Sequence, residues 1–269
     1  QGIKSSGASN IASAVKNVPG VSIQGGKYVY VRGLGDRYTK SILNGVDIPG
    51  LDPDRNTIQM DIFPTNILDN IIVVKSAAAE YPADFTGGVI DIVTKDFPTK
   101  ATYSISTGAG YNPNMHFNDG YLSYTGSNTD FLGFDDGMRN LPVNRFQTIP
   151  GTFNNSTVLS NMTNVFNKEL TAKQNNSGAN FDFGFTAGNQ YDVGDNKLGY
   201  QLSLSYKNKT EFYDDRIDGT YMKDQNDASV NELLGTRRSE GIVGNNSVLL
   251  STHAGIVYKR DKAKYKINF

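Results

Sequence analysis

The chain has 269 residues, of which 38% are hydrophobic and 20% are charged, and this composition excludes an intrinsically disordered protein. With 26 Lys and Arg against 27 Asp and Glu, it has no basic excess of the kind that nucleic-acid binding requires. It contains no Cys, which excludes disulfides, thiolate metal sites and cysteine nucleophiles, and no apolar run approaches the roughly 18–20 residues of a spanning helix.

The first hundred residues have the mixed pattern of a small α+β domain. Residues 9–15 predict a short helix, because their apolar side chains share one face, and Pro19-Gly20 ends it. Turn residues such as Asn44-Gly45 separate several strand-like runs, which is typical of a small sheet. The predicted strands are residues 28–32, 41–46, 70–75 and 89–94.

After Lys100 the pattern changes to alternation with a period of two, which predicts strands with one apolar face. Each run has about the 9–11 residues that a tilted strand needs to cross a bilayer, the last run being cut short. The alternating residues of the five runs are Tyr103, Ile105, Thr107 and Ala109; Phe181, Phe183, Phe185 and Ala187; Tyr200, Leu202, Leu204 and Tyr206; Leu250, Thr252, Ala254, Ile256 and Tyr258; Ala263, Tyr265, Ile267 and Phe269.

The connections between these runs alternate in length. Residues 194–197 and 260–262 predict tight turns. Roughly 70 residues separate the first two runs and roughly 40 the third and fourth, both more than an ordinary soluble loop. Short turns at one end and long loops at the other are typical of an outer-membrane barrel. A soluble β-sandwich also alternates and stays an alternative, but it has no reason to sort its loops by end.

The first long connection contains a helical pattern. Its apolar residues predict a small amphipathic helix that packs on its own loop or on the barrel wall, with a substrate lid as the alternative. These residues are Val158, Leu159, Met162, Val165, Phe166 and Leu170.

Five strands do not close a barrel, because small barrels need about eight strands and large plugged barrels about 22. A bare edge at Phe269 would also leave unpaired backbone groups in lipid. The predicted fold class is therefore an α+β domain followed by the first strands of an antiparallel transmembrane β-barrel, which continues past Phe269 to about 22 strands.

Five ordered segments in the first hundred residues form a recognisable series: ASNIASAVKNVPGV at 8–21, YVRG at 30–33, ILNGVDIP at 42–49, IIVVK at 71–75 and YPADFTGGVIDIVTK at 81–95. Together they resemble the plug of TonB-dependent outer-membrane receptors. A later stretch, FLGFDDG at 131–137 followed by LP at 141–142, resembles a Bacteroidetes branch of that family. The resemblance implies a plug domain at residues 1–97 and the N-terminal strands and outer loops of an incomplete barrel at residues 98–269.

The resemblance also implies a mechanism and partners. Outer loops and the plug apex would bind a scarce or large solute, and TonB of the inner membrane would pull the plug to open a path through the barrel. The implied partners are TonB, outer-membrane lipid and, as a further candidate, a surface lipoprotein. The implied location is the outer membrane of a Gram-negative bacterium. No TonB box is recognisable within these 269 residues, so the contact that couples energy to transport is not visible in this sequence.

Two groups of residues are candidates for function. Arg32 and Arg37 match the plug arginines that the family holds against barrel carboxylates, so they are candidates for a plug–barrel lock; a structural ion pair or an exposed side chain is the alternative. Asp52, Asp54 and Arg55 form a polar plug loop that could face the outside and contact the solute.

Neither a metal, a cofactor nor a catalytic activity is expected. Asp52 and Asp54 fit the start of a calcium loop, but Thr57 stands where the turn Gly of an EF-hand belongs and Phe63 where its final Glu belongs. The two His residues, His116 and His253, lie far apart in the sequence, which argues against a zinc or catalytic site built from them.

Two alternatives to an importer stay open. One is a secreted β-rich binding module, which would dissolve in water. The other is a receptor-like barrel that serves as a component of a larger cell-surface assembly, which would retain partner proteins on gentle purification. The solute is also open, because siderophore, cobalamin, glycan and peptide importers share the same plug pattern.

Overall fold

The computed structural model describes residue 15 and residues 18–50, 52, 55, 57–63, 67–76, 79, 81, 85–151, 156–168, 171–225 and 229–269. Within these residues, no helix has both the length and the apolar character needed to cross a membrane. The predicted helix at 9–15 lies outside this set except for Val15, which is helical and 1% exposed.

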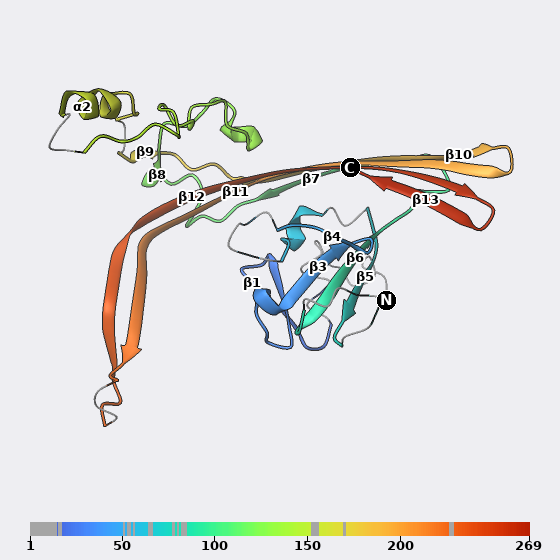
Figure 1. Ribbon diagram of the computed structural model, residues 1–269, viewed down its shortest axis with the longest axis horizontal. Coiled ribbons are helices and arrows are strands. Elements are labelled where there is room, and N and C mark those ends of the chain that lie inside the picture. The colour runs from blue at the N-terminus through green and yellow to red at the C-terminus, as the bar shows by residue number, and fades with distance from the viewer. Residues whose placement is uncertain are drawn as a thin grey trace. The chain divides into compact units, whose positions relative to one another are not determined.

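Two small sheets build the N-terminal domain (Figure 1). The first pairs β1 (Val21–Gln24) with β2 (Tyr28–Val31), and β1 is a strand that the sequence analysis did not predict. The second has four strands in the order β4-β3-β6-β5, so β6 lies between two neighbours. Its strands are β3 (Thr39–Leu43), β4 (Val46–Asp47), β5 (Leu68–Val74) and β6 (Gly88–Thr94). Of two short 3-10 turns, η2 (Asp36–Tyr38) directly precedes β3 and η3 (Met60–Ile62) lies between β4 and β5 in sequence.

The strongest apolar run of the domain forms its central strand, β6. It pairs in parallel with β3 and antiparallel with β5, and its Val89, Ile90 and Ile92 are all 0% exposed. A strand that is covered on both faces needs apolar side chains on both, which is why this segment reads as a nearly continuous apolar run. Ile90 and Ile92 join Val29 and Val31 of β2 in the main core.

The hairpin between β3 and β4 follows directly from its two turn residues. Asn44 has φ 51° and Gly45 has φ 81°, so both central residues are left-handed. A two-residue turn of this kind requires positive φ twice, and Asn-Gly is the pair that adopts it at least cost. The turn predicted at these residues is confirmed, but the single strand predicted at 41–46 is wrong in extent, because the turn divides it into β3 and β4.

Five antiparallel strands follow the plug, in the sheet order β13-β12-β11-β10-β7 (Figure 1). All five predicted runs are confirmed as strands. Gly194 (φ 62°) and Asp261 (φ 49°) lie in the two tight turns, as predicted. The strands are β7 (Thr102–Gly110), β10 (Asn180–Val193), β11 (Asn196–Lys223), β12 (Leu233–Arg260) and β13 (Ala263–Asn268).

The predicted long loop between β11 and β12 is wrong. The alternation ends near residue 206 and resumes near residue 250, but β11 and β12 each have 28 residues and continue through that interval. Backbone hydrogen bonds between two strands do not depend on an apolar face, so a polar hairpin can extend where hydrophobic alternation has stopped. The connection that remains is residues 224–232.

The connection between β7 and β10 is long, as predicted, and has structure of its own. It contains β8 (Tyr121–Ser123), which pairs with β9 (Lys173–Asn175), and the short turn η5 (Asp130–Leu132). The predicted helix is confirmed as α2 (Ser156–Asn164). Its packing is only partial, because Val158 is 45% exposed and Val165, just past the helix end, is 55% exposed. Leu170 lies outside the described residues.

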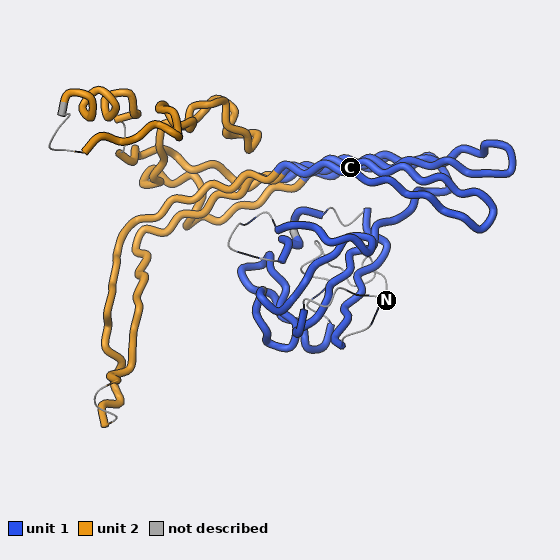
Figure 2. The backbone as a smooth tube through the Cα atoms, in the orientation of Figure 1, with its two compact units in different colours: residues 1–107, 182–206, 250–269 blue, residues 108–181, 207–249 orange. Residues whose placement is uncertain are grey.

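The chain divides into two compact units, which Figure 2 shows in blue and orange. Unit 1 contains residues 1–107, 182–206 and 250–269, which are the N-terminal domain and the strand segments next to the tight turns. Unit 2 contains residues 108–181 and 207–249, which are the long connection and the segments of β11 and β12 next to residues 224–232. Each unit is described by itself below.

Candidate functional site

Within unit 1, one carboxylate after β6 meets the lysines of the β12–β13 hairpin. Asp96 lies 3.0 Å from Lys259 Nζ and 2.5 Å from Lys264 Nζ, and Lys266 Nζ is 4.0 Å away. The Asp96 side chain is 28% exposed. Three cations from one hairpin therefore surround a single acid at the end of the N-terminal domain.

The charge state of Asp96 follows from these contacts. Partial burial opposes ionisation, but the hydrogen bonds from Lys264 and Lys259, together with their positive charge, outweigh it and hold the pKa of the Asp96 carboxyl below its ordinary value. The carboxylate is thus ionised at neutral pH, and the ion pairs persist over the whole physiological range.

The third lysine binds the N-terminal domain itself. Lys266 Nζ donates to Thr94 Oγ1 at 2.8 Å and to the Thr94 carbonyl oxygen at 3.1 Å. Thr94 is in turn held by Asn44, whose Oδ1 accepts the Thr94 backbone N–H at 2.9 Å. The left-handed turn residue, the end of β6 and a side chain of β13 therefore form one connected network. The Lys266 side chain is only 16% exposed, so these hydrogen bonds are shielded from water.

A polar cavity of about 690 Å³ lies beside this cluster, also within unit 1. Asp96, Lys259 and Lys264 line it, together with Thr186 of β10 and Gln201 of β11. The cavity places the Asp96 ion pairs at the boundary between the N-terminal domain and the strands that follow it.

The two arginines predicted as a lock lie on the surface of the described structure. Arg32 follows β2 with φ 58° and is exposed, and Arg37 is exposed in η2. Neither guanidinium has an ion-pair partner among the residues that the structure describes. Their assignment as a lock stays a prediction, while the contacts that the structure does show involve Asp96 and the three lysines. Nothing in the local sequence around Asp96 signals these contacts, because its partners lie more than 150 residues away.

The polar plug loop is held against β2. Asp52 accepts a hydrogen bond from the Tyr28 hydroxyl at 3.1 Å, and the Arg55 guanidinium lies 4.3 Å from the centre of the Tyr28 ring. Burial raises the pKa of the Tyr28 hydroxyl, and the neighbouring Asp52 raises it further. Asp52 and Arg55 are both half-buried, and their ligand-facing role stays a prediction. Asp54 lies outside the described residues.

The two histidines have separate surroundings. His116 is 3% exposed and is held at both ring nitrogens, by the Asn112 backbone N–H at 2.9 Å and by the Thr210 carbonyl at 3.2 Å, which is a structural role. His253 lies on the less exposed row of β12, with both ring nitrogens buried and unpaired among the described residues. No group of three or more metal-ligating side chains occurs in the described part of the chain.

The architecture is that of a small α+β plug joined to antiparallel strands, and the comparisons with known proteins agree with it. Residues 1–89 match the family model of the TonB-dependent Receptor Plug Domain. The Vitamin B12 transporter BtuB of Photobacterium profundum is 30% identical over 132 residues, which is 47% of this chain and 20% of the relative. The protein of the same name from Vibrio vulnificus is 22% identical over 241 residues, which is 84% of this chain and 37% of the relative.

Residues 1–89 therefore belong to the plug-domain family of the TonB-dependent receptors, and the chain continues from this domain into antiparallel strands. It spans between a fifth and two fifths of the length of these curated relatives. The Bacteroidetes branch and the plug boundary at residue 97 stay predictions.

Two solved structures also resemble the chain, and the identification does not depend on them. The outer membrane transporter YddB from Escherichia coli superimposes with a TM-score of 0.47 and 12% identity, over 98% of this chain and 30% of that one. A ferric enterobactin receptor (PfeA) mutant from Pseudomonas aeruginosa gives a TM-score of 0.32 and 13% identity, over 92% of this chain and 44% of that one.

Proposed function

We propose that the intact protein is an outer-membrane importer that admits a scarce or large solute through a plug-gated β-barrel, in a step that TonB drives. In this proposal the chain acts as a receptor and carries no enzymatic activity. Its location is the outer membrane of a Gram-negative bacterium, as for the relatives that the chain resembles.

One observation carries the proposal: a plug domain leads directly into antiparallel strands whose turns are short at one end, while the connection from β7 to β10 at the other end is long. The turns after β10 and β12 are tight, whereas residues 111–179 connect β7 to β10. Periplasmic turns of outer-membrane barrels are short and their outer loops are long. This arrangement would put residues 111–179 on the outside of the cell.

The exposure of side chains along β11 supports the same proposal. Leu202 is 45% exposed, while its neighbours Gln201 and Ser203 are both 6% exposed. A water-soluble sheet would bury the leucine and expose the two polar residues. The exposure pattern of β11 is therefore the opposite of that in a water-soluble sheet. A strand of a plugged barrel needs an apolar side chain toward lipid and polar side chains toward the interior.

Gating in this proposal requires a plug that is held in place at rest and released on pulling. The ion pairs of Asp96 with Lys259 and Lys264 are one set of contacts that can hold it, at the point where the plug joins the strands. Arg32 and Arg37 are proposed as a second set, with carboxylates of the remaining barrel as partners. Asp52 and Arg55 are retained as candidates for contact with the solute.

The proposal is tested with the full-length protein in its native host and in a strain that lacks TonB. We expect the protein in the outer-membrane fraction, extractable only with detergent, and we expect one class among ferric siderophores, cobalamin, oligosaccharides and peptides to accumulate only when TonB is present. A protein that is monodisperse in plain buffer overturns the membrane location. A membrane-embedded protein that co-purifies with partners but accumulates no solute supports a surface assembly instead of an importer.

A further inference from the structure

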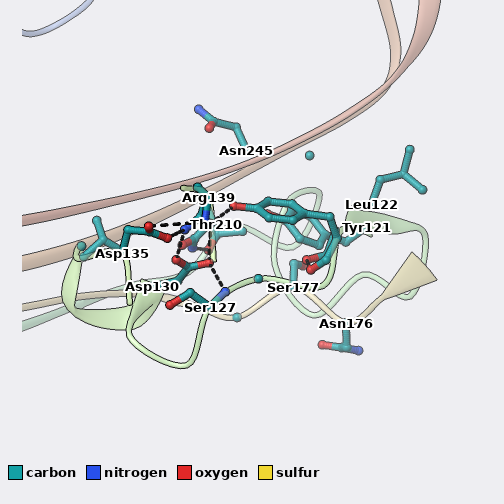
Figure 3. A pocket seen from close by; sticks show the side chains of 18 of the residues that line it. Tyr121, Leu122, Ser127, Asp130, Asp135, Arg139, Asn176, Ser177, Thr210 and Asn245 are labelled. Carbon is teal, nitrogen blue, oxygen red and sulfur yellow. Dashed lines mark hydrogen bonds and ion pairs between the residues drawn. The ribbon is translucent and has the colours of Figure 1, made fainter. Parts of the chain in front are cut away.

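A cavity of unit 2 lies where the long connection meets β11 and β12. It has a volume of about 760 Å³, and its wall combines residues 121–139 and 176–178 with Thr210 of β11 and residues 244–248 of β12 (Figure 3). Sites for small ligands in proteins generally measure about 300–1,000 Å³, so this cavity has room for a ligand of several rings.

The wall of the cavity is fixed before any ligand arrives. Ser177 is 1% exposed and donates from its hydroxyl to the Met115 carbonyl at 2.9 Å. The buried His116 ties the connection to β11 through the Thr210 carbonyl. Tyr121 and Phe212, 7% and 5% exposed, pack their rings with centroids 6.2 Å apart. A site that is held in this way loses little conformational entropy on binding.

The three charged side chains of the cavity wall are paired with one another: Arg139 contacts both Asp130 and Asp135, which leaves one negative charge in excess. Arg139, the only cationic residue among those described that line the cavity, lies 2.7 Å from each oxygen of Asp130 and 2.9 Å from Asp135 Oδ1 (Figure 3). Hydrogen bonds from Arg139 lower the pKa of Asp130, and Asp130 in turn raises the pKa of Arg139, so both stay ionised. An anionic ligand therefore meets no unpaired cation here, and a cationic ligand meets carboxylates that are already occupied.

The remaining polar residues of the wall are uncharged. The side-chain amide nitrogen of Asn246 donates to Thr210 Oγ1 at 3.0 Å and to Asn208 Oδ1 at 2.8 Å. Its side-chain oxygen Oδ1 accepts no hydrogen bond from any residue that the structure describes. The other uncharged polar residues of the wall are Ser123, Ser127, Asn176, Ser177, Thr210 and Asn245. Two aromatic residues of the wall, Tyr124 and Phe134, are 62% and 59% exposed. The Arg139 guanidinium lies over the Tyr124 ring, 5.6 Å from its centre, so the accessible aromatic surfaces are the Phe134 ring and the opposite face of Tyr124.

We infer that this cavity binds an uncharged, hydroxyl-rich ligand of the oligosaccharide class. Hydroxyl groups both donate and accept, so they match amide and hydroxyl partners without any net charge. The C–H face of a sugar ring is apolar and packs on an exposed aromatic ring, whose face is electron-rich. That the cavity faces outward and loads the importer rests on the proposed function, whereas the binding itself does not.

The inference is tested by measuring binding of the purified, detergent-solubilised full-length receptor to neutral oligosaccharides, with acidic oligosaccharides, a ferric siderophore and cyanocobalamin as comparison ligands. The test variant is Phe134→Ala with Asn246→Ala, which removes one ring and one amide from the cavity wall. The control is Phe166→Ala with Asn161→Ala, which makes the same two changes in the same connection but outside the cavity. We expect a neutral oligosaccharide to bind the parent and the control equally, and the test variant at least about tenfold more weakly.

Three outcomes overturn the inference: no neutral oligosaccharide binds at millimolar concentration, only charged ligands bind, or the test variant and the control bind equally. The elution position and the circular dichroism spectrum of the test variant show whether it is folded like the control. If the importer proposal fails while this inference holds, the outcome is different: oligosaccharide binding depends on Phe134 and Asn246, but no TonB-dependent accumulation follows in cells.

Discussion

Lys266 Nζ lies 2.8 Å from the hydroxyl oxygen of Thr94, so a side chain of β13 binds the last residue of β6. The link joins two segments that are 172 residues apart in sequence. Asn44 binds Thr94, and its Oδ1 also accepts from Lys266 Nζ at 3.5 Å, so a change at Lys266 is expected to affect the β3–β4 hairpin as well.

Replacing Lys266 by Met tests this link. The change keeps the apolar stem but removes the ammonium group, so Thr94 loses a charged hydrogen-bond donor, at a cost of about 1–2 kcal/mol of local stability. We expect faster amide hydrogen exchange in residues 88–94 of the full-length receptor. Lys262→Met is the matched control, because Lys262 lies in the exposed turn of the same hairpin. Equal exchange in the two variants would show that Lys266 does not hold the plug.

A second prediction concerns pH and Asp96. The folded-state pKa of Asp96 is lowered, so its ion pairs stabilise the fold above the ordinary carboxyl pKa and are lost as the pH falls through the folded-state value. We expect the melting temperature to fall more between pH 7 and pH 3 in the parent than in Asp96→Asn. The measurement is thermal unfolding followed by circular dichroism. Asp195→Asn, at the exposed turn after β10, should behave like the parent.

The same cluster shows what sequence reasoning could and could not reach. The Asn44-Gly45 and residue 194–195 turns were predictable because positive φ at fixed positions demands particular residue types. The partners of Asp96 were not predictable, because the positions of Lys259, Lys264 and Lys266 in the sequence do not indicate which distant carboxylate they contact. The length of β11 and β12 was missed for a related reason: alternation reports the environment of a strand, and a polar extension leaves no such trace.

Gly45 provides a third prediction, about backbone conformation alone. A Cβ at this position would meet no atom within 4 Å, so packing does not forbid a side chain, but φ is 81°. Gly45→Ala should therefore cost about 1–2 kcal/mol of plug stability through strain only. Gly151→Ala is the control, since that glycine also has open space but no positive φ. The comparison is made by urea unfolding, and equal midpoints would refute the strained turn.

The last prediction concerns the wall of the cavity in unit 2. A Cβ on Gly244 of β12 would lie 2.4 Å from the Leu122 carbonyl oxygen and 2.9 Å from the Tyr121 ring, so β8 and β12 approach each other more closely than any side chain permits. Gly244→Ala should push β8 away at a cost of about 1–3 kcal/mol, and it should raise hydrogen exchange at residues 121–123. Gly241→Ala, on the same strand with nothing within 4 Å, should change neither quantity.

If Tyr121 must stay in place to shape the cavity, Gly244→Ala will also weaken ligand binding although no polar or aromatic group has been removed. Unchanged exchange at residues 121–123 would mean that β8 can move without cost, and the cavity would then not be fixed in advance.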